Sequence, residues 1–189
     1  MRVFGIDPGS VRTGYGCIET DGRRHRLVTC GAITSPPKSA LAARLAVIHG
    51  RLTALIASSH PDCIVIENLF HAKNVKSALV LGHARGVAVL AAVQARLPIV
   101  EYTPAEIKAS VVGYGRADKN QMQQMVKLLL GLDTAPAPHD AADALAVAIC
   151  HVHACGPIAQ AAAAAGRAPR HLRSWRHVTP AQLARRQAP

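Results

Sequence analysis

The fold is decided by the stretch Val3-Phe4-Gly5-Ile6-Asp7-Pro8-Gly9-Ser10, near the start of the chain. It is a short apolar run followed by a Pro-Gly-Ser combination, which is typical of a strand that ends in a turn. Two further strand candidates follow at residues 14–20 and 26–34, and Asp21-Gly22 between them is a hairpin signal. The first third of the chain therefore predicts three strands close enough in sequence to form an antiparallel meander.

The chain then alternates between helix and strand patterns. After Pro36-Pro37, apolar residues recur at spacings of four and three, which predicts one face of an amphipathic helix: Leu41, Leu45, Ile48, Leu52 and Leu55. The next run, Cys63-Ile64-Val65-Ile66, is fully apolar, as in a central strand that is covered on both faces. The later elements are expected as a helix at residues 75–96, a strand at 98–102, short helices at 104–112 and 119–130, and a last helix from His139.

This order of elements predicts an α/β fold with a mixed five-stranded sheet and helices on both faces. The first three strands are expected to be antiparallel. The later strands are expected to be parallel, because each follows a helical crossover, and such crossovers are right-handed.

Length and composition limit the kind of protein. The 189 residues allow one domain, or one domain with a small appendage. Half of the residues are apolar, so we expect a folded core rather than disorder. The 22 basic and 11 acidic residues give a net charge of +11, which favours a polyanionic partner such as nucleic acid or an anionic membrane. Charge alone does not distinguish DNA, RNA and lipid.

The composition changes at Gly156. Beyond it lie an alanine run and six arginines, with no acidic residue; the arginines are Arg167, Arg170, Arg173, Arg176, Arg185 and Arg186. We therefore expect residues 1–155 to form the folded domain. Residues 156–189 are expected to be a flexible basic extension, or a weak helix that becomes ordered on a partner.

Several features favour a cytoplasmic protein without a membrane partner. The first residues lack the charged and apolar segments of a signal peptide. The longest helical apolar segment is interrupted by His83 and Arg85, which argues against a membrane span. Five cysteines without a Cys-x-x-Cys pair are typical of a reducing compartment. His151 and Cys155 share a helix face and could hold a metal, but a polar helix end is the simpler explanation.

The few carboxylates stand at informative positions. Asp7 ends the first strand and Glu67 ends the fourth, so the two side chains lie together if these strands are parallel neighbours. Asp140 and Asp143 are three residues apart at the start of the last helix, so both project from one helix face. Each also has an ordinary explanation: Asp7 as a turn residue, Glu67 as the exit of a strand, and the last two as helix-capping charges.

Converging carboxylates repel one another unless cations neutralise them or some stay protonated. Their hard oxygen atoms suit Mg²⁺ or Mn²⁺. Two such ions about 4 Å apart can stabilise the attacking and leaving oxygens of a phosphodiester. A basic chain with one acidic pocket therefore suggests a nuclease.

The same residues stand in a pattern that resembles the RuvC-type crossover junction endodeoxyribonucleases, the bacterial Holliday-junction resolvases of the ribonuclease-H-like superfamily. The resemblance covers roughly residues 1–153 and leaves out the tail. Its motifs, in family-like order and spacing, are Gly5-Ile6-Asp7-Pro8-Gly9, Ile66-Glu67-Asn68-Leu69-Phe70, Ala72-Lys73-Asn74, Leu81-Gly82-His83-Ala84-Arg85-Gly86, Val111-Val112-Gly113-Tyr114-Gly115 and Asp140-Ala141-Ala142-Asp143-Ala144-Leu145-Ala146.

The resemblance implies a ribonuclease-H-like homodimer that makes symmetric nicks in two opposed strands of a four-way DNA junction, in homologous recombination and DNA repair. It implies Mg²⁺, with Mn²⁺ as a substitute and two ions per site, held by catalytic carboxylates that correspond to Asp7, Glu67, Asp140 and Asp143. In some relatives a His takes one position of the last group, so the share of His139 stays open. Branch-migration motor and junction-binding proteins are the partners that the family implies.

The resemblance also assigns DNA-binding residues. Lys108 and Lys119 correspond to lysines that bind DNA, and Phe70 to an aromatic residue that stacks on an unpaired base. Lys73 and Lys76 are candidates for further contacts with the DNA backbone, together with Arg85 and Arg116. Solvated lysines and a buried Phe70 are the ordinary alternatives.

The second helix is a candidate dimer interface. Ala78, Gly82 and Gly86 repeat every four residues, so two such helices could approach closely. The alternative is that this small-residue stripe packs on the protein's own sheet.

Other functions stay open from the sequence. An actin-like nucleotide-binding domain has a phosphate loop that resembles Ile6-Asp7-Pro8-Gly9-Ser10 followed by Thr13-Gly14, but it needs two such domains. A non-catalytic junction-binding protein would use the carboxylates only structurally. A general ribonuclease H is a related enzyme, which the lysine-bearing middle segment and the expected dimer disfavour.

Overall fold

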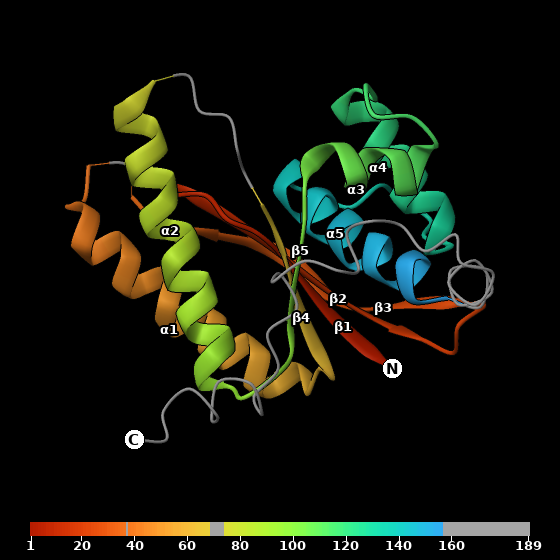
Figure 1. Cartoon of the computed structure of the whole chain (residues 1–189), viewed down its shortest axis with the longest axis horizontal. Coiled ribbons are helices and arrows are strands. Elements are labelled where there is room, and N and C mark those ends of the chain that lie inside the picture. The colour runs from red at the N-terminus through yellow and green to blue at the C-terminus, as the bar shows by residue number, and fades with distance from the viewer. Residues whose placement is uncertain (37, 69–73, 157–189) are drawn as a thin grey trace, which may run out of the picture.

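The computed structural model describes residues 1–36, 38–68 and 74–156 (Figure 1). Its centre is a five-stranded sheet in the order β3-β2-β1-β4-β5. The strands are β1 (Arg2–Asp7), β2 (Arg12–Thr20), β3 (His25–Thr34), β4 (Cys63–Glu67) and β5 (Ile99–Tyr102). The pairs β1–β2 and β2–β3 are antiparallel, and β1–β4 and β4–β5 are parallel. The predicted mixed sheet is confirmed.

Helices cover both faces of this sheet. One face carries α1 (Leu41–Ser59) and α2 (Val75–Gln94), and the other carries α3 (Pro104–Val112), α4 (Lys119–Leu129) and α5 (His139–Cys155), as Figure 1 shows. All of these elements were expected, and the bounds differ from the predicted ones by a few residues.

Strand alternation divides the core between the two faces. In β1, Val3 faces the helix α5 side, whereas Phe4 and Ile6 pack with the apolar residues of α1 and α2. β4 divides in the same way, with Val65 on one side and Ile64 on the other. Both strands are therefore fully buried, as their apolar runs predicted.

Helix α5 lies unusually close to β1 and β2. A Cβ atom added at Gly5 would lie 2.1 Å from the Ala144 carbonyl oxygen, and one added at Gly14 would lie 2.0 Å from that of Asp140. Small residues on the strands and on the alanine-rich helix therefore allow direct backbone contact. This contact fixes the first turn of α5 over the carboxyl end of β1.

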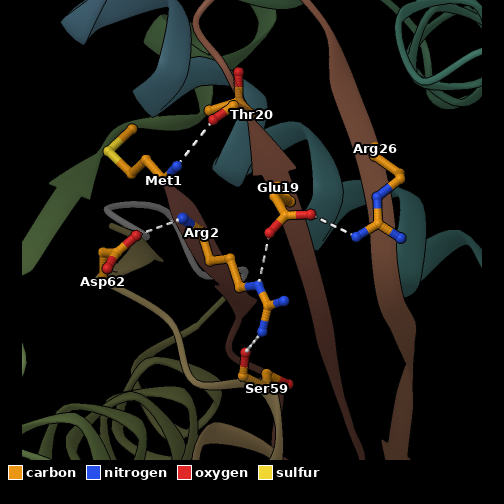
Figure 2. A network of polar contacts seen from close by, with 7 residues as sticks. All are labelled: Met1, Arg2, Glu19, Thr20, Arg26, Ser59 and Asp62. Atoms are coloured by element: carbon orange, nitrogen blue, oxygen red, sulfur yellow. Dashed lines mark hydrogen bonds and ion pairs between the residues drawn. The ribbon is translucent and has the colours of Figure 1, made fainter.

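A network of charged residues lies at the opposite end of β1 (Figure 2). Arg2 donates from Nε to Glu19 at 3.1 Å and from Nη1 to the Ser59 carbonyl oxygen at 3.1 Å. Arg26 reaches the same Glu19 carboxylate at 2.5 Å. Asp62 accepts the Arg2 backbone N–H at 2.6 Å. Every carboxylate in this network has a positively charged or N–H partner.

By length and composition alone, α1 and α2 are both apolar enough to cross a membrane, which is weak support for a membrane protein. The sequence interpretation considered only the second of them. Both helices pack on the sheet and on each other, through Ile48 and Leu52 of α1 and Ala84 and Ala88 of α2. Their outward faces keep exposed apolar side chains, among them Leu79 and Leu90.

Candidate active site

Two strand ends begin the site. Asp7 is the last residue of β1 and Glu67 the last of β4, and the parallel ladder between these strands pairs Ile6 with Ile66. The two carboxylates are close enough for a side-chain hydrogen bond, so their predicted adjacency is confirmed. Their position follows from topology, because the carboxyl ends of neighbouring parallel strands meet at one sheet edge.

The first turns of α5 complete the acidic cluster. Asp143 lines the same cavity as Asp7 and Glu67, whereas Asp140, one turn earlier, is not among the lining residues. Asp140 instead lies beside Arg12, with 3.8 Å between Oδ2 and Nη1. His139, the first residue of the helix, is exposed. The two acids that share a helix face therefore differ in their surroundings.

Two lysines line the same cavity as the carboxylates, which has a volume of about 320 Å³. Lys108 comes from α3 and Lys119 is the first residue of α4. The remaining wall is made of Pro104, Ile107, Met122 and Ala146. Basic and acidic groups in one cavity suit a phosphate held next to bound cations.

Capping boxes fix the two helices that carry the lysines. In α3 the Thr103 hydroxyl accepts the Glu106 N–H, and the Glu106 carboxylate accepts the Thr103 N–H in return. Asp118 and Gln121 do the same at the start of α4. Each box satisfies two backbone N–H groups that would otherwise lack partners. The lysines therefore project from well-defined helix starts.

Burial disfavours the charged form of every carboxyl group in the cavity. It is the main cause that raises the pKa of Asp7 well above its ordinary value, and the neighbouring Glu67 carboxylate raises it further. Burial also raises the pKa of Glu67 and of Asp143, while Lys108 and Lys119 act in the opposite direction on both. The close approach of the two side chains adds to the raised pKa of Asp7 and opposes the effect of burial on the pKa of Glu67.

This donor set fits a divalent cation. Within residues 1–36, 38–68 and 74–156, no three His, Cys, Asp or Glu side chains already form a group that could hold an ion. The carboxylate oxygens of Asp7, Glu67 and Asp143 are the hard ligands that Mg²⁺ and Mn²⁺ prefer, and their mutual repulsion, which contributes to the raised pKa of Asp7, is of the kind that a bound cation would offset.

Comparison with known proteins assigns the family. The family described as "Crossover junction endodeoxyribonuclease RuvC" matches residues 3–151. The chain is 54% identical over 153 residues to the RuvC of Alkaliphilus oremlandii, with 81% of this chain and 93% of that protein covered. It is 52% identical to the RuvC of Chloroflexus aggregans, with the same coverage.

The chain belongs to the RuvC family. A solved structure of Thermus thermophilus RuvC in complex with a Holliday junction substrate superposes with a TM-score of 0.78 at 32% identity, over 82% of this chain and 94% of that one. The chain is therefore a Holliday-junction-resolving endonuclease with a ribonuclease-H-like fold, and metal dependence is typical of its family. The actin-like and non-catalytic alternatives are set aside.

The other predicted DNA-binding residues of this RuvC-family protein lie away from the cavity or outside the described residues. Phe70 and Lys73 lie outside the described residues. Lys76 is exposed in the first turn of α2 and is not among the residues that line the cavity. Arg85 forms an ion pair with Glu101 of β5, and its side chain is 30% exposed.

The small-residue stripe of α2 faces away from the sheet. Ala78, Gly82 and Gly86 are exposed and line an open groove on the outer surface. The sequence left open whether this stripe packs on the sheet; in the structure Ala84 and Ala88 make that contact instead. Cβ atoms added at either glycine would meet nothing within 4 Å.

Sequence reasoning missed Arg12 and the apolar wall formed by Ile107 and Met122. A signal for Arg12 was available, because it lies two residues before Gly14, which pairs with Asp7 in the antiparallel register. No comparable signal marked Met122, since its contact with the cavity depends on how α4 packs against α5.

Proposed function

We propose that this cavity is where the resolvase cuts DNA, with Asp7, Glu67 and Asp143 as metal-binding catalytic carboxylates and Asp140 joining them when the site is loaded. The cation is Mg²⁺, with Mn²⁺ as a substitute, and two ions occupy each site. The observation that carries the proposal is the meeting of three carboxylates from β1, β4 and α5 with two lysines in one cavity.

The residues of the chain divide the work. A bound divalent ion supplies Lewis-acid stabilisation of the phosphodiester oxygens and lowers the pKa of the attacking water. Asp7 and Glu67 would hold the ion as ionised carboxylates, because only ionised carboxylates bind metal well. Lys108 and Lys119, which line the same cavity, would bind the phosphate and offset the charge that develops on it. Ile107 and Met122 exclude bulk water from one side.

Symmetric nicking requires two active sites that are related by a two-fold axis. A four-way junction has two-fold symmetry, and a homodimer formed through the exposed stripe of Ala78, Gly82 and Gly86 would present two equivalent cavities to opposed strands. The exposed Leu79 and Leu90 beside the stripe support this interface, since apolar surface of this kind favours association.

Further DNA contacts lie outside the cavity. Lys76 at the start of α2, with Lys73 and Phe70 in the segment before it, would contact the junction near its centre, with Phe70 stacked on an unpaired base. Residues 1–155 form the nuclease domain in this proposal. Residues 156–189, of which the structure describes only Gly156, add sequence-independent attraction to DNA. The enzyme acts in the cytoplasm, beside branch-migration motor and junction-binding proteins.

A junction cleavage assay tests the catalytic roles. With Mg²⁺, the purified protein is expected to cut synthetic four-way junctions symmetrically into ligatable products and to leave linear duplex intact. Asp7→Asn and Glu67→Gln are each expected to abolish cutting and to retain junction binding. Glu19→Gln removes one carboxylate charge from the network at the other end of β1 and serves as the matched control. Cleavage that survives either cavity variant would refute the proposed site.

The dimer interface is tested separately. Gly82→Glu places a charge in the stripe without a clash inside the protomer, so the protein is expected to become monomeric in analytical ultracentrifugation and to lose paired nicking. Gly50→Glu on α1 is the control, because a side chain there also meets nothing within 4 Å and Gly50 does not line the groove. A Gly82→Glu protein that remains dimeric would place the interface elsewhere.

A further inference from the structure

Asp140 has a cationic partner, Arg12, to which the proposed function assigns no role. Arg12 is the first residue of β2 and Asp140 the second of α5, so their ion pair joins the sheet to the helix beside the cavity. The side chains are 57% and 27% exposed, respectively. The charge of Asp140 acts on the cavity, because it contributes to the raised pKa values of Asp7 and Asp143.

The backbone holds both partners in place. The Thr13 hydroxyl donates to the Gly9 carbonyl oxygen at 2.7 Å, and the Ser35 N–H donates to that of Val11 at 3.0 Å. These bonds fix the start of β2. The contact of Gly14 with the Asp140 carbonyl fixes the first turn of α5 against the same strand. The backbone positions that carry the two side chains are therefore held by contacts other than their ion pair.

An exposed pair of this kind contributes little to stability. Its effect is local, because the guanidinium neutralises one of the four acids and its positive charge opposes a cation at Asp140. Arg12 also has a second class of possible partner. A guanidinium binds phosphate through two parallel hydrogen bonds, and more than half of this side chain is open to solvent.

We propose that Arg12 is a positioning residue that exchanges Asp140 for a DNA phosphate. In the free enzyme it holds Asp140 beside the cavity; a phosphate that binds Arg12 releases the carboxylate to the metal. The inference rests on the proposed function, which assigns Asp140 as a ligand. Junction and metal then raise each other's affinity by the same factor, since linkage is reciprocal.

The test measures binding rather than cleavage. Mn²⁺ affinity of the full chain without DNA is followed by electron paramagnetic resonance, and junction affinity in EDTA by fluorescence anisotropy. Arg12→Ala is expected to bind Mn²⁺ about two- to fivefold more tightly and the junction about two- to fivefold more weakly, the range for an exposed ion pair. Arg12→Lys keeps the charge and is expected to restore Mn²⁺ affinity, with junction affinity between the two.

Controls separate the inference from the proposal beneath it. Arg23→Ala removes an equal charge at the β2–β3 hairpin and should leave Mn²⁺ affinity unchanged. Asp140→Asn should weaken Mn²⁺ binding, and adding Arg12→Ala to it should change nothing further. If Asp140→Asn has no effect on Mn²⁺, the assignment of Asp140 as a ligand is wrong. If Asp140→Asn weakens Mn²⁺ binding but Arg12→Ala leaves it unchanged, the exchange by Arg12 is wrong.

Discussion

The carboxylates at the two ends of strand β1 have pKa values shifted in opposite directions. At its start, Glu19 accepts hydrogen bonds from Arg26 and Arg2, which lower its pKa (Figure 2). At its other end, burial and the neighbouring Glu67 raise the pKa of Asp7. The distance between these two environments is one short strand. The first arrangement satisfies the charge within the protein, and the second leaves it for a ligand to satisfy.

This contrast distinguishes a structural cluster from a reactive one. Acidic residues alone would mark both ends of the sheet. Both ends have a pocket with acidic and basic lining residues, but the acids differ: the pKa values of Glu19 and Asp21 are lowered by hydrogen bonds, whereas those of Asp7, Glu67 and Asp143 are raised by burial. The unfavourable burial of Asp7 persists because the fold places it there, and a bound cation would offset its cost.

The largest effect is expected at Asp143. Asp143→Asn removes a carboxylate from the cavity, and we expect the single-turnover cleavage rate with Mg²⁺ to fall at least about a hundredfold, as when a catalytic charge is lost. Glu19→Gln, at the paired end, should change the same rate less than about twofold. Equal losses in the two variants would show that the ends of β1 do not differ in function.

A smaller effect is expected from the two lysines of the cavity. Lys119→Ala should slow cleavage by about tenfold and reduce the slope of log Kd against log salt by about one, because one phosphate contact is lost. Lys127→Ala, on the last turn of the same helix and outside the cavity lining, is the control. An unchanged salt slope in Lys119→Ala would argue against a phosphate contact.

The metal-free protein should reveal the raised pKa of Asp7 through its stability. The ordinary pKa of an Asp carboxyl is 3.8, and that of Asp7 is raised in the fold. The folded state therefore keeps a proton that the unfolded chain releases, so stability falls as the pH rises from about 4 through the folded pKa. In EDTA, Asp7→Asn should melt a few degrees higher than wild type near pH 7, with the difference vanishing at low pH; about 1 kcal/mol moves Tm by ~2–4 °C at this size.

A melting difference for Asp7→Asn that stays constant between pH 4 and 8 would contradict this account. Mg²⁺ should reverse the order of the two proteins, because only wild type would gain stability from a complete ligand set.

The smallest effect is expected at Glu19, and with the opposite sign. Its pKa is lowered from an ordinary 4.5, so its contribution to stability is present at neutral pH and is lost as the pH falls through the folded pKa. Glu19→Gln should therefore melt slightly below wild type at pH 7 and equal it in strong acid. High salt should shrink the difference, because the pair is exposed. A Glu19→Gln protein that melts above wild type at pH 7 would contradict the pairing.

Much of this site follows from the sequence. Apolar runs that end in Asp7 and Glu67 predict two strands. The sequence placed the two side chains together only if these strands were parallel neighbours, and the register between β1 and β4 confirms that they are. The position of the lysines beside the carboxylates was harder to predict, because an amphipathic helix can direct a lysine toward solvent as easily as toward a cavity. Lys108 and Lys119 line the cavity of the carboxylates only because of how α3 and α4 pack.

The difference between Asp140 and Asp143 could not be predicted. Helical spacing puts both on one face, but their surroundings depend on how closely α5 approaches β2 at Gly14. The outward orientation of Gly82 and Gly86 was open for the same reason, since a stripe of small residues suits either a sheet or a second helix. Tertiary distances of this kind leave no trace in sequence periodicity.

The backbone contact between α5 and the sheet has a genetic consequence. A methyl group at Gly5 or Gly14 would push helix α5 outward, and Asp143 with it, although neither glycine is among the residues that line the cavity. Substitutions that weaken the enzyme or make it heat-sensitive are therefore expected at the strand positions that contact α5, as well as at the residues that carry out the chemistry.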